Sequence, residues 1–429
     1  MISNKYYNFA RDKLFKLPRS LTGKGTKDTL IHIKRMFPKL KIHKVRSRTK
    51  VYDWKIPDEW NIKKAYVIDK YEKKIIDFSD HNLHLVSYSK PIKSTITKKE
   101  FLKKVYSLPS RPSSIPYVTS YYKKDWGFCV PDNLKKKIKK NYKTNDKFKI
   151  LIDSSFNKKG SLNYGEYYIP GKSKKEILIS TYICHPSMAN NELSGPIVSM
   201  SLINYFSKKK LNKSLRFIFI PETIGSLTFI KKNFKKIKKN FLAGFNLTCL
   251  GDERMYSCML SKYQNSVSDE AILAAYKKRK INFKIFSFLD RASDERQYNS
   301  PGIDLPFTSV FRSKYHEYPE YHTSDDNFKI VTKKGIYGSY KLVKTAIEII
   351  QKNIYPKSKF LGEPMLSKRG LYSFISKKDS WKSARGLLDI LQFSDGRNSI
   401  ERISKYTNIK RSKLNNYIKI LNKFNLIEI

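Results

Sequence analysis

Short apolar runs alternate with amphipathic segments between residue 148 and about residue 350. Segments with helical spacing of their apolar residues are found at 196–208, 227–238, 268–280 and 334–352. Between them lie runs rich in β-branched and aromatic residues, which predict strands: FKILIDS (148–154), EILISTYI (176–183), SLRFIFI (214–220), FLAGFNLTCL (241–250), INFKIFSF (281–288) and LPFTSVF (305–311). This alternation predicts the α/β class, with a mixed sheet that carries helices on both faces.

The flanking segments have different patterns. Residues 1–45 read as basic helices, and residues 51–92 read as short alternating strands broken by Pro, Asp and Asn, which indicates a small β-rich unit. Beyond residue 356, three short helices (WKSARGLLDIL, SIERISKYTN and RSKLNNYIKILNKF) precede an extended LIEI, which predicts a winged-helix-like module. We therefore expect four segments: the N-terminal part of the α/β domain (1–50), an inserted β-rich domain (51–130), the main α/β domain (131–356) and the winged-helix-like domain (357–429).

The composition fits a folded protein of two or three domains. The chain has 429 residues, of which 40% are hydrophobic and 14% aromatic, so general disorder is excluded. No run of about 18 apolar residues predicts a membrane helix, and the first residues lack the apolar core of a secretory signal. The four cysteines are far apart and form no CxxC pair, which favours a reduced, cytoplasmic protein: Cys129, Cys184, Cys249 and Cys258.

The formal net charge of +50 raises the question of nucleic-acid binding, because a cationic face attracts phosphates. However, lysine far outnumbers arginine, and Asn, Ile, Tyr and Phe are also abundant, as AT-rich codon usage would produce. The lysines are spread along the whole chain and form no arginine-rich stripe. We therefore interpret most of them as solvated surface and expect no sequence-specific nucleic-acid partner.

Polar residues follow four of the predicted strands. In open α/β sheets, ligands bind beyond the carboxyl ends of strands, so side chains at these ends converge. Two histidines and several carboxylates arranged in this way are suited to a zinc ion. The residues are His185 with Asn191 and Glu192 behind it, Glu222, Asp294 and Glu295, and His322.

Each of these residues also has an ordinary structural explanation. A histidine in a loop often serves only as a hydrogen-bonding group, and Glu222 can be a charge at a helix N-terminus. Asp294 can cap a short helix, and Asn191 with Glu192 can form a turn before an N-cap at Ser194. It is their joint occurrence at strand ends that favours a metal site, even though the sequence has no HExxH motif.

Five ordered motifs resemble one known family: CHPSMANNELSGP, IPETIGS, GFNLTCLGD, ASDERQYNSPGIDLP and YPEYHTSDDN. Together they are similar to the prokaryotic aminopeptidase-like proteins with a DUF4910 domain, whose fold is related to the M28 zinc aminopeptidases. The segment DWKIPDEWNIKKAYV…HNLHLVSYSKP resembles the DUF2172 domain inserted in the same proteins, and the tail from about 360 resembles their winged helix. The resemblance covers nearly the whole chain and implies an M28-like fold.

The resemblance also implies roles for single residues. His185 matches the first metal-binding histidine, His322 the last one, and Glu222 the general base. Asn191 stands where M28 enzymes have a bridging aspartate, and Glu192, one position further on, can supply the carboxylate instead.

Other M28 metal ligands are altered in this chain. Thr223 replaces a ligand glutamate, and Thr248 stands near a ligand aspartate. Asp294 matches a loop beside the site, as a candidate ligand or as a residue that supports one. These changes favour one zinc ion per chain over two.

Three hypotheses follow for the function. The first is a zinc-dependent aminopeptidase-like hydrolase that acts on a peptide or other amide, with Glu317 or Glu320 binding the substrate amine. The second is another amide reaction at the same site, such as amide formation or deacylation, in polysaccharide or natural-product biosynthesis. The third is an inactive metal-binding or ligand-binding module whose winged helix contacts DNA or a protein. We expect no membrane partner, and homo-oligomerisation stays open.

Overall fold

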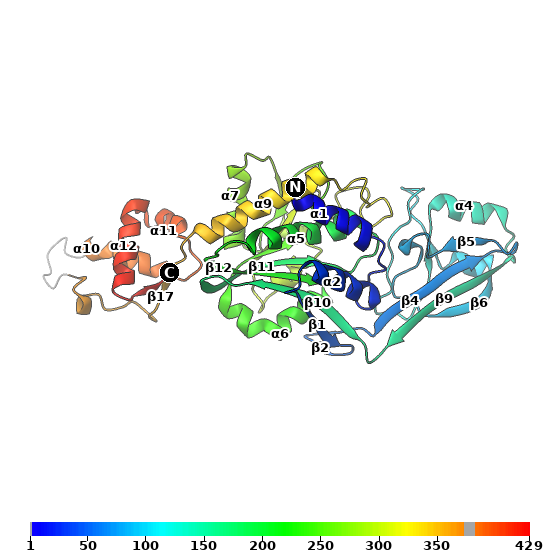
Figure 1. Ribbon diagram of the computed structural model, residues 1–429, viewed down its shortest axis with the longest axis horizontal. Helices are drawn as coiled ribbons and strands as arrows, with labels where there is room; N and C mark the ends of the chain where they lie inside the picture. Colours follow the sequence, from blue (N-terminus) through cyan, green and yellow to red (C-terminus); the bar gives the residue numbers. More distant parts are fainter. Residues whose placement is uncertain (1, 373–381) are drawn as a thin grey trace.

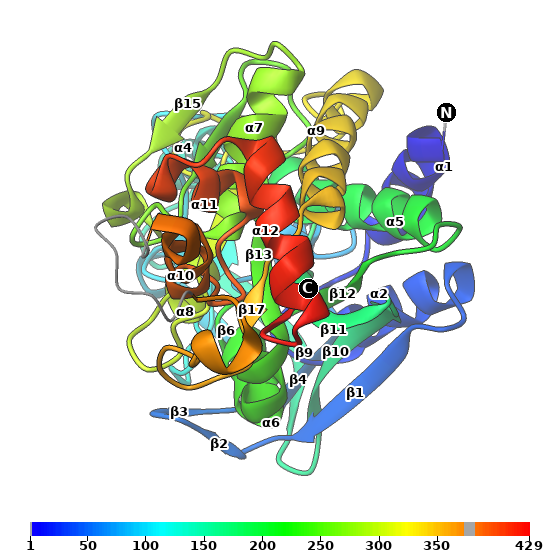
Figure 2. The same ribbon diagram turned by 90° about the vertical axis from the view of Figure 1, so that its left-hand side faces the viewer.

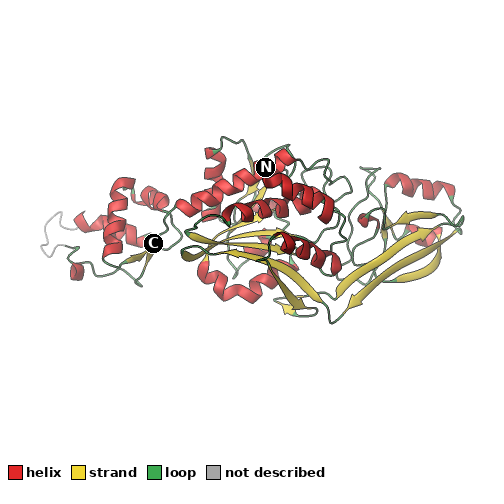
Figure 3. Ribbon diagram, viewed as in Figure 1, coloured by secondary structure: helices red, strands yellow, loops and turns green. Residues whose placement is uncertain are grey.

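The computed structural model describes residues 2–372 and 382–429, which form three units in a row (Figure 1). A central α/β unit lies between a small β-rich unit and a C-terminal helical module. Figure 3 shows the same division by element type, with long strands in the central and β-rich units and mainly helices in the module.

The central unit is built on a mixed sheet of eight strands in the order β1-β10-β12-β11-β13-β16-β14-β15. The four middle strands, β12, β11, β13 and β16, are parallel, while β1, β10 and β14 pair in antiparallel fashion. In register, Ile179 of β11 lies opposite Phe217 of β12 and Phe245 of β13. The strands are β1 (Lys41–Arg46), β10 (Ser161–Ile169), β11 (Ser173–Tyr182), β12 (Lys213–Ile220), β13 (Phe241–Leu247), β14 (Ser257–Met259), β15 (Lys284–Phe286) and β16 (Phe307–Phe311).

Both faces of this sheet are buried beneath helices. Along β11, Ile177 and Ile179 belong to one apolar core and Leu178 to the other, as the two-residue period of a strand requires. The first face is covered by α1 (Ile2–Phe9), α2 (Lys24–Met36), α5 (Ser194–Phe206), α7 (Val267–Lys278) and α9 (Lys333–Lys352). The opposite face is covered by α6 (Ile224–Asn240) and α8 (Glu295–Tyr298), with α6 below the sheet in Figure 1. The predicted α/β architecture is confirmed.

The β-rich unit contains a second sheet, and one predicted strand belongs to it. This sheet has the order β5-β4-β9-β6 and comprises β4 (Glu59–Ile68), β5 (Lys74–Asp77), β6 (Ile92–Thr97) and β9 (Lys147–Asn157). We expected 148–154 in the large sheet, and this was wrong, because β9 pairs with β4 and β6 instead. Its buried residues Phe148, Ile150 and Ile152 alternate with more exposed ones, a pattern typical of a sheet with one covered face.

The boundary of the inserted unit at residue 130 stays a prediction, and the structure offers an alternative to it. Both β9 and α4 (Asp132–Asn141) follow residue 130, and they share an apolar core with the small sheet. We propose that the inserted unit runs to about residue 157 instead of 130. Its remaining short elements are β2 (Lys50–Val51), β3 (Trp54–Lys55), α3 (Lys98–Leu102), β7 (Val105–Tyr106) and β8 (Phe128–Cys129). The similarity of this unit to DUF2172 stays a prediction.

The C-terminal module has its own apolar core and contains the predicted helices. Its elements are β17 (Lys357–Ser358), α10 (Lys382–Gln392), α11 (Ile400–Thr407), α12 (Arg411–Lys423) and β18 (Ile427–Glu428). Trp381, the first residue of the expected first helix, lies outside the described residues. Arg402 of α11 joins the module to the central unit, because its Nε lies 2.6 Å from Oε1 of Glu270 in α7. Figure 2 shows the module in front of the central unit. Within 2–372 and 382–429, every helix is too short or too polar to cross a bilayer.

Candidate functional site

The turn between β11 and α5 is held in place by one buried carboxylate. The segment Ala189–Leu193 forms a π-helical turn, a feature frequent at functional sites. The carboxylate of Asp326 accepts hydrogen bonds from the backbone N–H groups of Ala189 (3.1 Å) and Asn191 (3.0 Å), and from the hydroxyl of Tyr318 (2.7 Å). Burial raises the pKa of Asp326 to about 6. These bonds help to position Asn191 and Glu192 in the interior.

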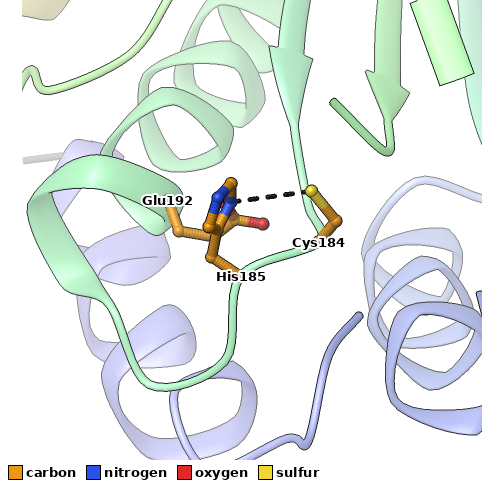
Figure 4. Close-up of side chains that lie close together, drawn as sticks. All are labelled: Cys184, His185 and Glu192. Carbon is orange, nitrogen blue, oxygen red and sulfur yellow. Dashed lines mark hydrogen bonds and ion pairs between the residues drawn. The ribbon is translucent and has the colours of Figure 1, made fainter. Parts of the chain in front are cut away.

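His185 is oriented by Glu192, which lies behind its ring. Nδ1 of His185 is 2.8 Å from Oε2 of Glu192, and Nε2 is 3.7 Å from Oε2 of Glu222. Figure 4 shows the Glu192 side chain behind the histidine ring and Cys184 beside it, with a dashed line from the ring to the sulfur. Nδ1–H of His185 donates a hydrogen bond to the Glu192 carboxylate, so Nε2 is the nitrogen that remains for a ligand. The structure therefore places Glu192 as a residue that supports His185.

A fully buried arginine accompanies this carboxylate. Nε of Arg19 donates to the backbone carbonyl of His185 at 2.9 Å and lies 3.9 Å from Oε1 of Glu192. Burial opposes a charge on His185, yet Cys184, Tyr117 and Glu192 together raise its pKa well above the ordinary value. The Glu192 carboxylate, which favours a proton on this ring, also favours a metal cation at Nε2.

The face of His185 opposite Glu192 opens into a pocket of about 430 Å³. The rings of His185 and His322 are 5.3 Å apart between centroids, and Tyr117 lies 5.2 Å from each. Nε2 of His322 is buried and has no hydrogen-bond partner among the described residues. Burial lowers the pKa of His322 well below its ordinary value, so the ring stays neutral and able to bind a metal. The pocket is lined by Leu21, Trp54, Tyr117, Thr119, Tyr121, Tyr122, Cys184, His185, Glu222, Thr223, Ile224, Arg296 and His322.

A strained turn presents Glu222 to this pocket. Thr223 has φ 62° and ψ −76°, and the N–H of Ile224 donates to the carbonyl of Glu222 at 2.8 Å. This is a γ-turn with positive φ, a rare and strained conformation for a β-branched residue. Burial raises the pKa of Glu222, against the opposing effects of His185 and Arg296. A carboxylate whose pKa is raised in this way is better suited to accept a proton from water.

Asp294 holds the same turn from outside the pocket. Its Oδ1 accepts hydrogen bonds from the N–H of Thr223 (2.7 Å) and the hydroxyl of Ser226 (2.8 Å). Burial, reinforced by the nearby Glu222 carboxylate, raises the pKa of Asp294 to about 8. Because Asp294 does not line the pocket, the structure supports a positioning role over metal ligation.

Asn191 belongs to an uncharged cluster beside His185. Its Nδ2 donates to the hydroxyl of Tyr182 at 2.8 Å, and that hydroxyl lies 2.5 Å from Oγ1 of Thr248. Oγ1 of Thr248 also lies 2.9 Å from the carbonyl of Asn191. Positions 191 and 248, which we expected near a second metal, are thus joined through a tyrosine and carry no negative charge, while Oδ1 of Asn191 is buried without a partner among the described residues. The cluster is unsuited to a second divalent ion.

Within the described part of the chain, three potential ligands lie within 4.8 Å of one another: Cys184, His185 and Glu192. Sγ of Cys184 lies 3.6 Å from Nδ1 of His185, the same nitrogen that Glu192 contacts. A catalytic triad requires the thiol and the carboxylate on opposite ring nitrogens, so this arrangement is not one. Burial also raises the pKa of Cys184 to about 12, which keeps the thiol protonated and makes it a poor ligand.

Glu317 and Glu320, predicted to bind a substrate amine, do not line the pocket. Glu320 lies 2.9 Å from Arg254, and Glu317 is exposed, with Oε1 3.9 Å from Lys314. Both carboxylates face other cations, so the structure does not bring them to the site, and their role stays a prediction.

Several residues of the site escaped the sequence reasoning. Arg19 and Trp54 come from segments that precede β10, and only the fold brings Arg19 to Glu192 and Trp54 to the pocket. The tyrosines of residues 117–122 did leave a signal, because three of six residues there are aromatic. Asp326 lies within the quoted motif YPEYHTSDDN, four residues after His322, but its capping role depends on the distant π-helical turn.

The fold is that of the zinc aminopeptidases. A zinc aminopeptidase from Bacillus subtilis superposes with a TM-score of 0.60 at 15% identity, covering 81% of this chain and 94% of that one. A peptidase M28 precursor from Shewanella amazonensis gives a TM-score of 0.56 at 9% identity, covering 85% and 95% of the two chains. At such low identities the comparisons establish the fold alone.

Closer relatives define the family. The profile described as "Domain of unknown function (DUF4910)" matches residues 7–353, and one described as a winged helix-turn-helix matches 353–429. The chain therefore belongs to the DUF4910 family. A Clostridium acetobutylicum protein, named as a candidate polysaccharide biosynthesis protein with an aminopeptidase-like domain, is 40% identical over 91% of this chain and 88% of its own. A crystal structure of a candidate peptidase from Clostridium acetobutylicum gives a TM-score of 0.79 at 36% identity, covering 99% and 96% of the chains.

Proposed function

We propose that this protein hydrolyses an amide bond with the help of one zinc ion. The observation that carries the proposal is the convergence of His185, His322 and Glu222 on one pocket at the ends of three different strands. Such convergence at carboxyl strand ends is where α/β enzymes place their chemistry.

The residues present fit one metal ion. Nε2 of His322 is buried without a described partner, and Nε2 of His185 points away from its supporting carboxylate toward Glu222. Two imidazoles and a nearby carboxylate are a common donor set for catalytic zinc. We therefore propose that His185 and His322 hold the ion, with Glu222 beside it. Zinc bound there would supply Lewis acidity toward the substrate carbonyl.

Glu222 is proposed as the general base. It takes a proton from the attacking water while the water oxygen forms the new bond to the carbonyl carbon. The C–N bond then breaks, and Glu222 passes the proton to the departing nitrogen. The raised pKa of Glu222 and the γ-turn that presents it support this role.

The test combines metal analysis with turnover. We expect at most about one equivalent of zinc per chain, lost in His322→Ala but kept in His316→Ala, whose exposed histidine does not line the pocket. Glu222→Gln should keep its zinc while turnover falls by about a hundredfold or more. Two tightly held ions per chain, or a Glu222→Gln protein of unchanged turnover, would refute the proposal.

The altered ligands support a second candidate, an inactive binding module. The uncharged cluster of Asn191, Tyr182 and Thr248 is the observation behind it. Zinc binding with no turnover of any amide would favour this candidate.

The name of the Clostridium acetobutylicum relative supports a place in polysaccharide biosynthesis, where N-acyl groups on sugars are amides.

A further inference from the structure

The pocket walls differ from those expected for a site that binds a free amino terminus. Among its described lining residues Glu222 is the one carboxylate, and that group is already assigned to proton transfer. Arg296 lines the same pocket, close enough to lower the pKa of Glu222. A substrate ammonium group would therefore meet a guanidinium and a metal site, with no carboxylate of its own to pair with.

Arg296 is an exposed side chain that is held by a hydrogen bond and has no ion pair among the described residues. Its Nη2 donates to Oγ1 of Thr223 at 2.8 Å, which fixes the side chain against the turn that carries Glu222. Within residues 2–372 and 382–429, no carboxylate pairs with this guanidinium. Its remaining N–H groups are suited to a planar carboxylate, which arginine binds through two parallel hydrogen bonds.

The inserted unit contributes an aromatic wall. Trp54 of β3 and Tyr122 are 41% and 54% exposed, with ring centroids 6.0 Å apart, and both line the pocket. The hydroxyl of Tyr122 donates a hydrogen bond to the carbonyl of Lys55 at 3.1 Å, which helps to fix the two rings relative to each other. Exposed aromatic rings at a pocket provide a stacking surface for an apolar, aromatic or sugar ring.

We infer that the substrate is an acidic amide without a free amino group beside the scissile bond. Its carboxylate binds Arg296, and a ring stacks against Trp54 and Tyr122. This inference rests on the proposed function for the reaction and on Arg296 and the aromatic wall for the substrate class. It separates this protein from enzymes that recognise an amino-terminal ammonium group.

A binding experiment tests the charge preference without requiring turnover. We would titrate the protein with 3-phenylpropionate and with phenethylammonium, two ligands with the same ring and opposite charges, by calorimetry at physiological salt. EDTA in the buffer removes metal that would otherwise bind the carboxylate. We expect the anion to bind about fivefold more tightly than the cation, since arginine binds a carboxylate through two parallel charge-assisted hydrogen bonds, while the exposure of Arg296 limits the gain.

Matched variants separate Arg296 from the general positive charge of the chain. Arg296→Gln should reduce the preference for the anion to about twofold or less, whereas Arg291→Gln removes an equal charge five residues away, outside the pocket, and should preserve it. Arg296→Lys keeps the charge and should retain part of the preference. Tyr122→Ala should weaken the anion and the neutral 3-phenylpropanol alike, because it removes only the stacking surface.

Turnover then distinguishes this inference from the proposed function. Zinc-loaded protein should hydrolyse succinyl p-nitroanilide faster than leucine p-nitroanilide. Preference for the leucine compound would overturn the inference and keep the hydrolase. Anion preference through Arg296 with no turnover of either compound would keep the inference for binding and remove the hydrolase. Equal affinity for both charged probes, no binding of either one, or an unchanged preference in Arg296→Gln would overturn the inference.

Discussion

At the scale of single residues, the orientation of His185 depends on the buried carboxylate of Glu192, which lies on the side of the ring away from the pocket. Glu192 is fully buried and faces both Nδ1 of His185 and the guanidinium of Arg19. A histidine fixed in this way presents one tautomer and one ring orientation to a metal, which raises the affinity of the site.

We predict that Glu192→Gln weakens zinc binding by about 10- to 100-fold. The glutamine keeps the shape and can still accept the Nδ1 hydrogen bond, but it lacks the charge that increases the basicity of Nε2. The variant should also unfold more easily, by about 3 kcal/mol, because Arg19 is left as a buried charge without a counterion. Competition with a zinc chelator and urea denaturation measure the two effects.

Glu176→Gln is the matched control. Glu176 is equally buried, and Oε1 pairs with Nη2 of Arg216 at 2.7 Å, at the start of β11 and far along the strand from His185. Its loss should lower stability by a smaller amount, because Arg216 keeps Glu166 as a counterion, and should leave zinc affinity unchanged. If both variants weaken zinc binding equally, Glu192 acts only through general stability and its positioning role is refuted.

The site residues that could be predicted from the sequence are those that follow a predictable strand. His185, Glu222 and His322 follow clear apolar strands, and parallel strands bring their carboxyl ends together, so the convergence was foreseeable. The direction in which the Glu192 side chain points could not be predicted. It depends on a π-helical turn capped by Asp326, which is 134 positions further along the chain. The role predicted for Glu317 and Glu320 stays a prediction, and the pairing of Glu320 with Arg254 was not foreseeable because these two residues become neighbours only in the fold.

At the scale of elements, the turn before α6 stores strain at the site. Thr223 adopts positive φ, which costs a β-branched residue about 1–3 kcal/mol. The bonds from Thr223 and Ser226 to Asp294 offset that cost and hold the turn. The strained residue is therefore the one that directly follows Glu222, the side chain that enters the pocket.

We predict that Thr223→Gly stabilises the protein by about 1 kcal/mol, since glycine adopts positive φ without a steric penalty. Turnover should fall at the same time, because a freer turn holds Glu222 less firmly. Thr228→Gly, in the interior of α6, is the control and should destabilise the protein through lower helix propensity. Denaturation curves and kcat for both variants provide the test, and equal destabilisation by both would contradict a strained turn.

Elements were predictable wherever burial follows a simple period. The parallel strands β11, β12, β13 and β16 were identified because both faces are buried, so each reads as a continuous apolar run. The strand β9 was also recognised as a strand, but its sheet was not, because pairing with β4 depends on residues about 90 positions apart. The short strand β14 was missed, since three residues carry too little pattern.

At the scale of the whole molecule, the positive charge is dispersed and not focused on the winged helix. Seven lysines line one cavity of about 700 Å³ between the starts of β11 and β12 and the module: Lys172, Lys174, Lys175, Lys213, Lys239, Lys352 and Lys357. In α12, Leu414, Ile418 and Leu421 form part of the module core, and the opposite face is exposed. That face resembles many other lysine-bearing surfaces of the chain.

We predict that the protein binds duplex DNA only through nonspecific electrostatics. A recognition helix needs side chains free to reach base edges, but Nη2 of Arg411 is already 2.8 Å from Glu401. The affinity should therefore be similar for random and genomic duplexes and be lost near physiological salt. Replacing Lys413 and Lys419 of α12 with glutamine should weaken binding no more than replacing Lys135 and Lys139 of α4. Fluorescence anisotropy at rising salt measures both effects. A complex that persists at physiological salt, prefers one sequence and depends on Lys413 would show instead that α12 reads DNA.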